Sequence, residues 1–181
     1  MRRRITGVAG TVLLTILAAC GAGKPAPKDD RAQFVQECSG GDGSACYMLG
    51  LELDTGTPEE RAKAAAYYAQ AAVLLEPECT DDAQACLWLG DMYHWARGTP
   101  ENEALAKSYY QRAITLLDRD CTDNNADACM ELQSRYETGD GVDADADTAK
   151  AYYHKAAQIY CDAGDPEACN ELLQLNMTKG E

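Results

Sequence analysis

The sequence predicts an all-α protein, namely an α/α solenoid of about eight helices that is stapled by disulfides. Three observations support this prediction. The cysteines Cys46, Cys86, Cys129 and Cys169 recur at intervals of 40, 43 and 40 residues, a period typical of stacked helical repeats. Apolar residues within each period follow the spacing of helices. Thr or Asp followed by Pro recurs where helices would begin.

The amino terminus carries the signals of export. Met1 to Arg4 is basic and Ile5 to Ala19 is uncharged, which is the layout of a secretory signal peptide. The uncharged run is shorter than the roughly 20 apolar residues that span a bilayer. Leu17-Ala18-Ala19-Cys20 resembles the bacterial lipobox, and this resemblance implies cleavage before Cys20 with acylation of its thiol and new amine. The alternative is ordinary cleavage near Ala19, which leaves Cys20 as a free thiol.

We therefore divide the chain into a signal peptide at 1–19, a lipidated N-terminus and flexible tether at 20–32, and a repeat domain at 33–181. Small, polar and proline residues fill the tether. Removing the three leader arginines leaves thirteen basic against 30 acidic residues, a net charge near −17. This charge disfavours a nucleic-acid partner and fits a solvated surface or a cationic partner.

Nine cysteines leave one unpaired thiol, which in an exported protein needs an explanation, and Cys20 accounts for it. The other eight form four local couples, 7 or 8 residues apart, with more than thirty residues between couples. Zinc sites and thioredoxin-like redox centres need closer spacings, and free buried cysteines would suit a reducing compartment. We predict four bridges: Cys38–Cys46, Cys79–Cys86, Cys121–Cys129 and Cys161–Cys169.

Each unit predicts two helices, an A helix after the cysteine couple and a B helix with a tyrosine pair. Leucine follows the second cysteine by three residues, and Gly50 and Gly90 then leave room for the partner helix. The tyrosine pairs are Tyr67-Tyr68, Tyr109-Tyr110 and Tyr152-Tyr153. Thr57-Pro58, Thr99-Pro100 and Asp165-Pro166 are the predicted helix starts. We expect an opening helix at 30–38, A/B pairs at 43–54/58–76, 83–95/101–118 and 126–138/145–163, and a closing helix at 166–177.

The combined pattern of Ala-Cys, Leu-Gly, turn glycines and Tyr-Tyr-x-x-Ala resembles Sel1-like repeats, which are related to tetratricopeptide repeats. The cysteine couples resemble those of cysteine-rich, exported Sel1-repeat proteins of the Hcp type. The resemblance covers roughly Gln33 to Met177, and Gln133 departs from it where a glycine is expected. It implies a curved array whose concave face holds a protein or peptide.

By analogy with tetratricopeptide repeats, A-helix residues that point away from the B helices would line this face. The candidates are Tyr47, Leu51, Asp54, Leu87, Asp91, His94, Trp95, Met130, Ser134 and Glu137. We single out His94 and Trp95. The alternative is that Trp95 packs in an A-to-B corner and His94 is solvated, because few interface residues dominate binding.

Together these features predict a lipoprotein of the bacterial envelope, on the outer membrane facing the periplasm, that binds an envelope protein or peptide as a monomer. A weak penicillin-binding protein or β-lactamase is an alternative implied by the Hcp-type resemblance alone, and a purely structural lipoprotein is another. No Ser-x-x-Lys or His-Glu-x-x-His motif occurs, so we assign no catalytic residue. We expect neither a cofactor nor a metal ion.

Overall fold

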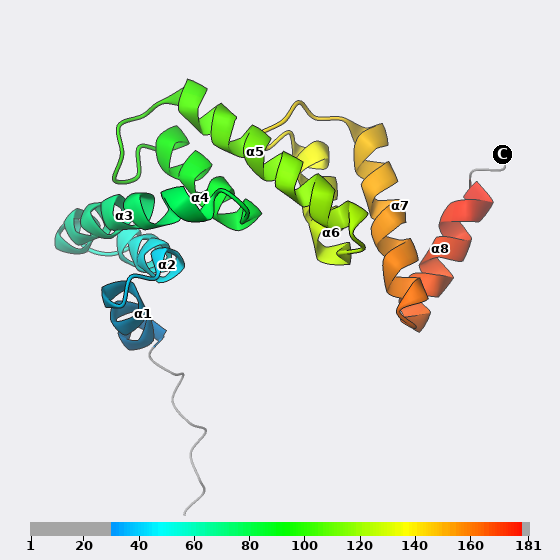
Figure 1. Ribbon diagram of the computed structural model, residues 1–181, viewed down its shortest axis with the longest axis horizontal. Helices are drawn as coiled ribbons and strands as arrows, with labels where there is room; N and C mark the ends of the chain where they lie inside the picture. The colour runs from blue at the N-terminus through cyan, green and yellow to red at the C-terminus, as the bar shows by residue number, and fades with distance from the viewer. Residues whose placement is uncertain (1–29, 179–181) are drawn as a thin grey trace, which may run out of the picture.

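The computed structural model describes residues 30–178 and is helical throughout its secondary structure there (Figure 1). The helices are α1 (Asp30–Ser39), α2 (Gly43–Asp54), α3 (Pro58–Glu78), α4 (Ala83–His94), α5 (Glu103–Thr122), α6 (Ala126–Thr138), α7 (Ala146–Asp162) and α8 (Pro166–Thr178). The predicted all-α architecture is confirmed. The predicted signal peptide and Cys20 lie outside the described residues. Within 30–178, no helix is long and apolar enough to cross a membrane.

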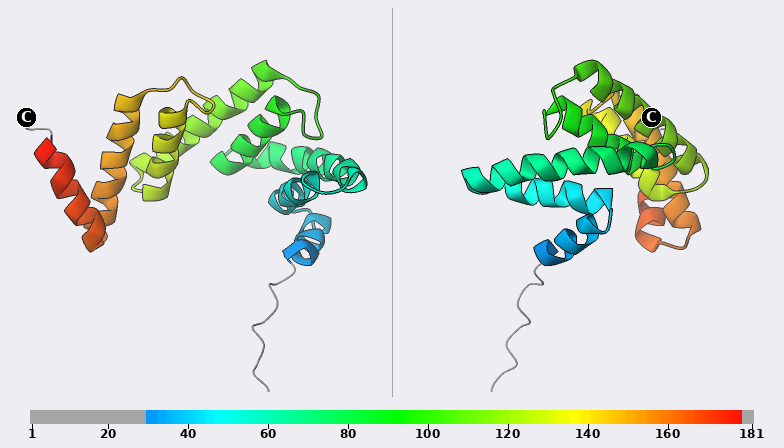
Figure 2. Two further views of the ribbon diagram at one scale, coloured as in Figure 1. Left: turned by 180° about the vertical axis from the view of Figure 1, so that it is seen from behind. Right: turned by 60° about the vertical axis from the view of Figure 1, so that its left-hand side comes forward.

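The helices are arranged as consecutive pairs, with each helix packed mainly against its neighbours in the chain. The A/B pairs are α2 with α3, α4 with α5, and α6 with α7, while α1 precedes the first pair and α8 follows the last. The pairs follow one another along a curved array whose two ends lie far apart (Figures 1 and 2). Such an array has a core built from nearest-neighbour interfaces.

Four disulfides connect the successive units. Each joins the end of one helix to the start of the next, across Cα–Cα distances of 4.6 to 4.8 Å: Cys38–Cys46, Cys79–Cys86, Cys121–Cys129 and Cys161–Cys169. The predicted pairing is confirmed. The first three bridges are buried, whereas Cys161 and Cys169 are half-buried. The last junction is therefore the most open to solvent.

The predicted apolar stripes form the core of the A/B pairs. Leu49, Leu89 and Leu132 of the A helices are fully buried, and so are Ala71 and Ala113 of the B helices. Burial of a leucine side chain contributes about 1.5–3 kcal/mol. The leucine and alanine positions that recur with the cysteine period therefore mark the contact between A and B helices.

Two glycines permit the close approach of the tyrosines. A Cβ atom built on Gly50 would lie 2.4 Å from Cε1 of Tyr68, and one on Gly90 would lie 2.4 Å from Cε1 of Tyr110. In the third unit the equivalent position is Gln133, which lines an open depression of about 240 Å³ together with Ala149 and Tyr153 of α7. The expected role of the glycines is confirmed.

One predicted helix start is wrong. Thr99-Pro100 was expected to cap the second B helix, but α5 begins at Glu103, and Asn102 is its N-cap, accepting from the Leu105 N–H at 3.0 Å. Thr99 instead donates its hydroxyl to the Met92 carbonyl at 2.8 Å. The loop folds back on the end of α4 before α5 begins. The Thr99 hydroxyl is therefore hydrogen-bonded to α4 and does not cap α5.

The other two predicted starts are confirmed. Thr57 and Glu60 form a capping box, in which each side chain accepts a hydrogen bond from the other residue's backbone N–H. The Thr57 N–H donates to the Glu60 carboxylate and lowers the pKa of that group. Asp165 accepts hydrogen bonds from the N–H groups of Glu167 and Ala168 at the start of α8.

Candidate functional site

Two of the predicted surface residues belong to the core. Tyr47 and Leu87 are each only 2% exposed. The Tyr47 ring stacks on Trp88 at a centroid distance of 5.2 Å, and its hydroxyl donates to Asp91 at 3.3 Å. An A helix in the array is covered by its own B helix and also by the next unit, so Tyr47 and Leu87 do not lie on an open face.

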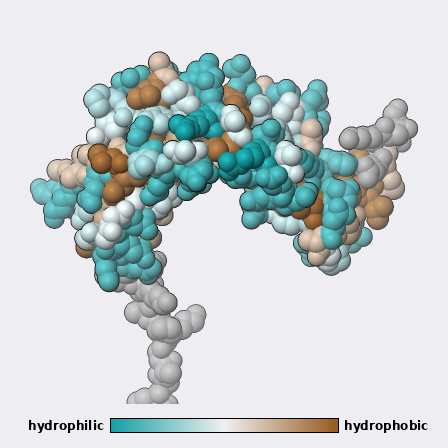
Figure 3. All heavy atoms as spheres, in the orientation of Figure 1, coloured by the Kyte–Doolittle hydropathy of each residue, from teal (hydrophilic) through white to brown (hydrophobic). Residues whose placement is uncertain are grey.

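The other eight candidates are partly or fully exposed. Leu51, Asp54, Asp91, His94 and Met130 are half-buried, while Trp95, Ser134 and Glu137 are exposed. Trp95 differs from the rest because it combines a large aromatic surface with 63% exposure. Hydrophilic residues predominate on the face shown in Figure 3, and hydrophobic ones form small separate patches. Whether any of these residues binds a partner stays a prediction.

A groove of about 760 Å³ lies beside Trp95, and we call it the tryptophan groove. The end of α4, the first half of α5 and the loop between α6 and α7 form its walls. His94 and Trp95 contribute from the first wall, Glu103 and Lys107 from the second, and Val142 and Asp143 from the third. The structure thus brings the two residues singled out from the sequence to one groove, together with residues that the sequence did not indicate.

A tight turn holds Trp95 outward. The Trp95 N–H ends α4 by donating to the Asp91 carbonyl at 2.9 Å, and Ala96 follows with a φ of 52°. Gly98 then packs on α3, where an added Cβ would lie 2.5 Å from the backbone nitrogen of Ala69. A side chain on a turn fixed in this way loses little conformational entropy when a partner binds.

His94 is fixed between Trp95 and α5. Its ring meets the Trp95 indole edge-on at a centroid distance of 4.5 Å. Nδ1 of His94 lies 2.7 Å from the Glu103 carboxylate. These contacts set the orientation of the indole relative to the groove.

The wall formed by the 139–145 loop is also fixed by contacts of its backbone. Gly141 packs on Tyr110, since an added Cβ would lie 2.7 Å from Cγ of that ring. Asp145 caps α7, and Asp140 pairs with Arg135 at 2.9 Å. Asp143 is exposed and forms no hydrogen bond or ion pair within the described residues. Its carboxylate is available to a partner.

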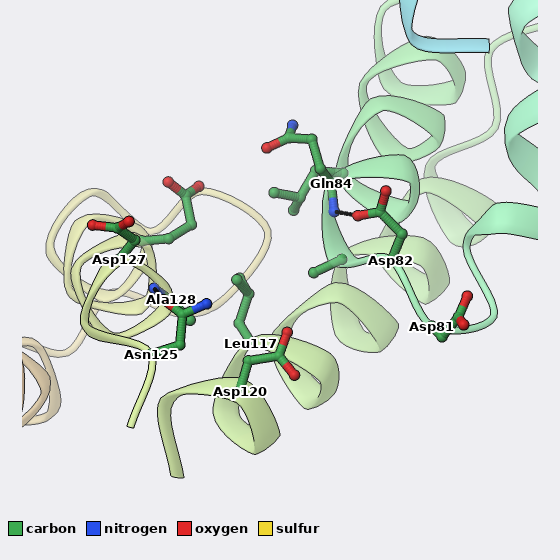
Figure 4. Close-up of a pocket in the computed structure, with 11 residues that line it drawn as sticks. Asp81, Asp82, Gln84, Leu117, Asp120, Asn125, Asp127 and Ala128 are labelled. Carbon is green, nitrogen blue, oxygen red and sulfur yellow. Dashed lines mark hydrogen bonds between the residues drawn. The ribbon is translucent and has the colours of Figure 1, made fainter. Parts of the chain in front are cut away.

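A second depression, the acidic pocket, has a volume of about 550 Å³ (Figure 4). It lies where α4 and α6 begin and α5 ends, and no lysine or arginine lines it. Its five carboxylates are those of Asp81, Asp82, Asp120, Asp127 and Glu131. Two of these carboxylates, those of Asp120 and Glu131, pair with Arg119 and Arg135 at 2.8 Å. Within 30–178, no His, Cys, Asp or Glu cluster could hold a metal ion.

Sequence reasoning missed the acidic pocket and most of the tryptophan groove. Aspartates recur between the two cysteines of every couple, and this recurrence was an available signal for the acidic pocket. Asp143 lies in the loop before Asp145, which is the N-cap of α7. No local pattern indicates that Lys107 and the 139–145 loop would line the same groove.

Comparison with known proteins supplies the family context. A family model for the Sel1 repeat matches residues 43–72, 83–116 and 126–158, more than half of the chain. A Sel1 repeat protein from Oxalobacter formigenes is similar, with 26% identity and a TM-score of 0.39 over 70% of this chain and 88% of that one. No curated protein matches the chain.

Two further solved structures are similar at lower identity. One is c5321, a protective antigen of uropathogenic Escherichia coli, with 21% identity, a TM-score of 0.35, and coverage of 78% of this chain and 35% of that one. The other is Helicobacter pylori cysteine rich protein B, with 23% identity, a TM-score of 0.34, and coverage of 83% and 100%.

Proposed function

We propose that this chain, which belongs to the Sel1 repeat family, is an envelope lipoprotein whose repeats bind another envelope protein or a peptide segment of one. Sel1 repeats generally mediate protein interactions. The proposal assigns a signal peptide to 1–19, a lipidated tether to 20–32 and the binding domain to 33–181. We expect the chain to act as a monomer.

The observation that carries the binding role is the exposed Trp95 at the tryptophan groove. Tryptophan is enriched among the residues that dominate binding energy at interfaces. The Trp95 indole lies on a fixed turn and presents apolar area to solvent, which a partner would cover on binding. His94 holds the indole in place, so the anchor is formed before the partner arrives.

Four disulfides support the proposed location. Such bridges persist in oxidising compartments outside the cytoplasm. The lipobox-like segment that ends at Cys20 supports an acylated amino terminus, and several acyl chains hold a protein at a membrane far more firmly than one. Gly21 after Cys20 supports the outer membrane, facing the periplasm.

A crosslinking pulldown from envelope lysate tests the binding role. We expect the full oxidised chain to recover a specific partner and Trp95→Ala to lose most of it. Val73→Ala is the matched control, because Val73 is also exposed, at 75%, but lies outside the groove. Equal recovery by both variants would remove the groove from the proposal. Recovery of no specific partner would favour a purely structural lipoprotein.

The anchor has its own experiment. Mass spectrometry of the mature protein should show a Cys20 amino terminus that carries acyl chains, and Cys20→Ser should move the protein from the membrane fraction to the soluble fraction. A free Cys20 thiol, or cleavage at another position, would contradict the anchor without affecting the binding role.

A further inference from the structure

We infer that the tryptophan groove selects basic peptide segments, with a lysine or arginine of the partner lying over the Trp95 indole beside the Asp143 carboxylate. This inference rests on the proposed function and narrows it, because it states the chemistry of the partner segment. Neither the family match nor the repeat pattern specifies this chemistry.

The charges around the groove favour a cationic occupant. Its lining holds four carboxylates, those of Glu103, Asp140, Asp143 and Asp145, against one ammonium, that of Lys107. The Asp140 charge is offset by Arg135, but Asp143 has no partner within the described residues. A neutral or acidic segment that covered Asp143 would leave a desolvated, unpaired charge, whereas a cation would pair with it.

The exposed indole fits the same occupant. Tryptophan is the best aromatic partner for a lysine or arginine cation, through the negative face of its ring. The methylene stems of these side chains also cover apolar surface while the charge stays hydrated, and Val142 supplies such surface in the groove. Because Trp95 is 63% exposed, the ring is accessible without rearrangement.

The acidic pocket is a second, separate source of negative charge on the same three helices, through the carboxylates of Asp81, Asp82 and Asp127. Residues from α4, α5 and α6 line both depressions but at opposite ends of these helices: the groove adjoins the end of α4 and the first half of α5, and the pocket adjoins the start of α4 and the end of α5. Surfaces that carry mainly negative charge raise the local concentration of a positively charged partner and its association rate.

A second copy of the chain is a poor occupant. The chain has a formal net charge of −14, so two copies repel each other on approach. Among the described residues, the groove is lined by acids far more than by bases. The favoured occupant is therefore a basic segment of a different protein.

A random dodecapeptide phage library tests this inference without assuming a sequence. The bait is the full oxidised chain, and the depleting bait is Trp95→Ala, whose fold is checked by circular dichroism. We expect the recovered peptides to be enriched in lysine and arginine. The strongest of them, synthesised with a fluorescent label, then serves as the probe for affinity measurements.

Four variants define the expected pattern of affinity for that probe. Trp95→Ala weakens binding by at least about thirty-fold, and Asp143→Lys weakens it by about ten-fold with a smaller dependence on salt. Lys107→Glu strengthens binding several-fold. Val73→Ala, outside the groove, leaves it unchanged.

Recovered peptides without an excess of basic residues, or tighter probe binding by Asp143→Lys, would overturn the inference. Failure to enrich any sequence would overturn it as well. None of these results decides the proposed function, because the pulldown measures recovery of the natural partner. A partner that depends on Trp95 but binds through an acidic or neutral segment would keep the function and refute the basic segment.

Discussion

The second tyrosines of the first two pairs occupy equivalent positions but have different hydrogen bonds. The Tyr110 hydroxyl donates to the Asp91 carboxylate at 2.8 Å. The Tyr68 hydroxyl is buried and has no hydrogen-bond partner in the described structure, although the Asp54 carboxylate lies nearby. Replacement by phenylalanine keeps both rings and removes only the hydroxyl. The two replacements should therefore have opposite effects on stability.

The expected magnitudes follow from the hydrogen bonds. Tyr110→Phe loses a bond to a charged acceptor, worth about 1.5–3 kcal/mol. Tyr68→Phe removes a buried hydroxyl whose lack of a partner already costs about 1–3 kcal/mol. We expect Tyr110→Phe to lower the free energy of unfolding by about 2 kcal/mol, and Tyr68→Phe to leave it unchanged or raise it by about 1 kcal/mol.

Urea unfolding of the oxidised chain, followed by circular dichroism, measures this difference. With a slope of about 2 kcal/mol per molar urea, the midpoints of the two variants should differ by about 1 M or more. Unequal slopes would indicate that the repeats no longer unfold together, and the comparison would then use amide exchange of α3 and α5. Equal destabilisation by both variants would refute the assignment of the Tyr68 hydroxyl as unpaired.

Three further predictions concern the turn, alkaline pH and the bridges. Gly98→Ala should destabilise the chain by about 1–3 kcal/mol more than Gly41→Ala, because both glycines have positive φ but only Gly98 packs on a backbone; equal urea midpoints would contradict this. Burial is the main cause that raises the pKa of Tyr68 and Tyr152 to about 12, so the folded chain keeps these protons when the unfolded chain loses them. Stability should therefore be constant up to about pH 10 and fall above it, and a urea midpoint that does not change between pH 9 and pH 11 would count against it. Brief treatment of the native chain with a phosphine reductant and iodoacetamide should label Cys161 and Cys169 first, since the other bridges are buried, and labelling of another couple first would contradict this order.

The sequence predicted those parts of the fold that depend on recurrence and local chemistry. The recurring cysteines located the bridges, and Gly50 and Gly90 located the close approach of the tyrosines. Thr57 was recognisable as a cap because its partner, Glu60, lies within the same turn. In each case the interacting groups are close in sequence or repeat with the unit.

The remaining features depend on contacts between units. Tyr47 is buried because Trp88 of the next unit stacks on it, and a helical stripe within α2 does not contain that information. Asn102 replaces Thr99 as a cap because the loop first returns to α4. The tryptophan groove likewise joins a turn of one unit to a loop of the next, so its composition became visible only in three dimensions.

The consecutive pairing of the cysteines has a consequence for biosynthesis. Each bridge closes over 7 or 8 residues, and no bridge encloses another. Under the proposed function, acylation removes Cys20, the first cysteine to emerge, from pairing. Each later couple can then be oxidised before the next cysteine appears, so for these eight the order of emergence is also the order of correct pairing. A simple thiol oxidant should therefore mature this chain, without a catalyst that reshuffles mispaired bridges.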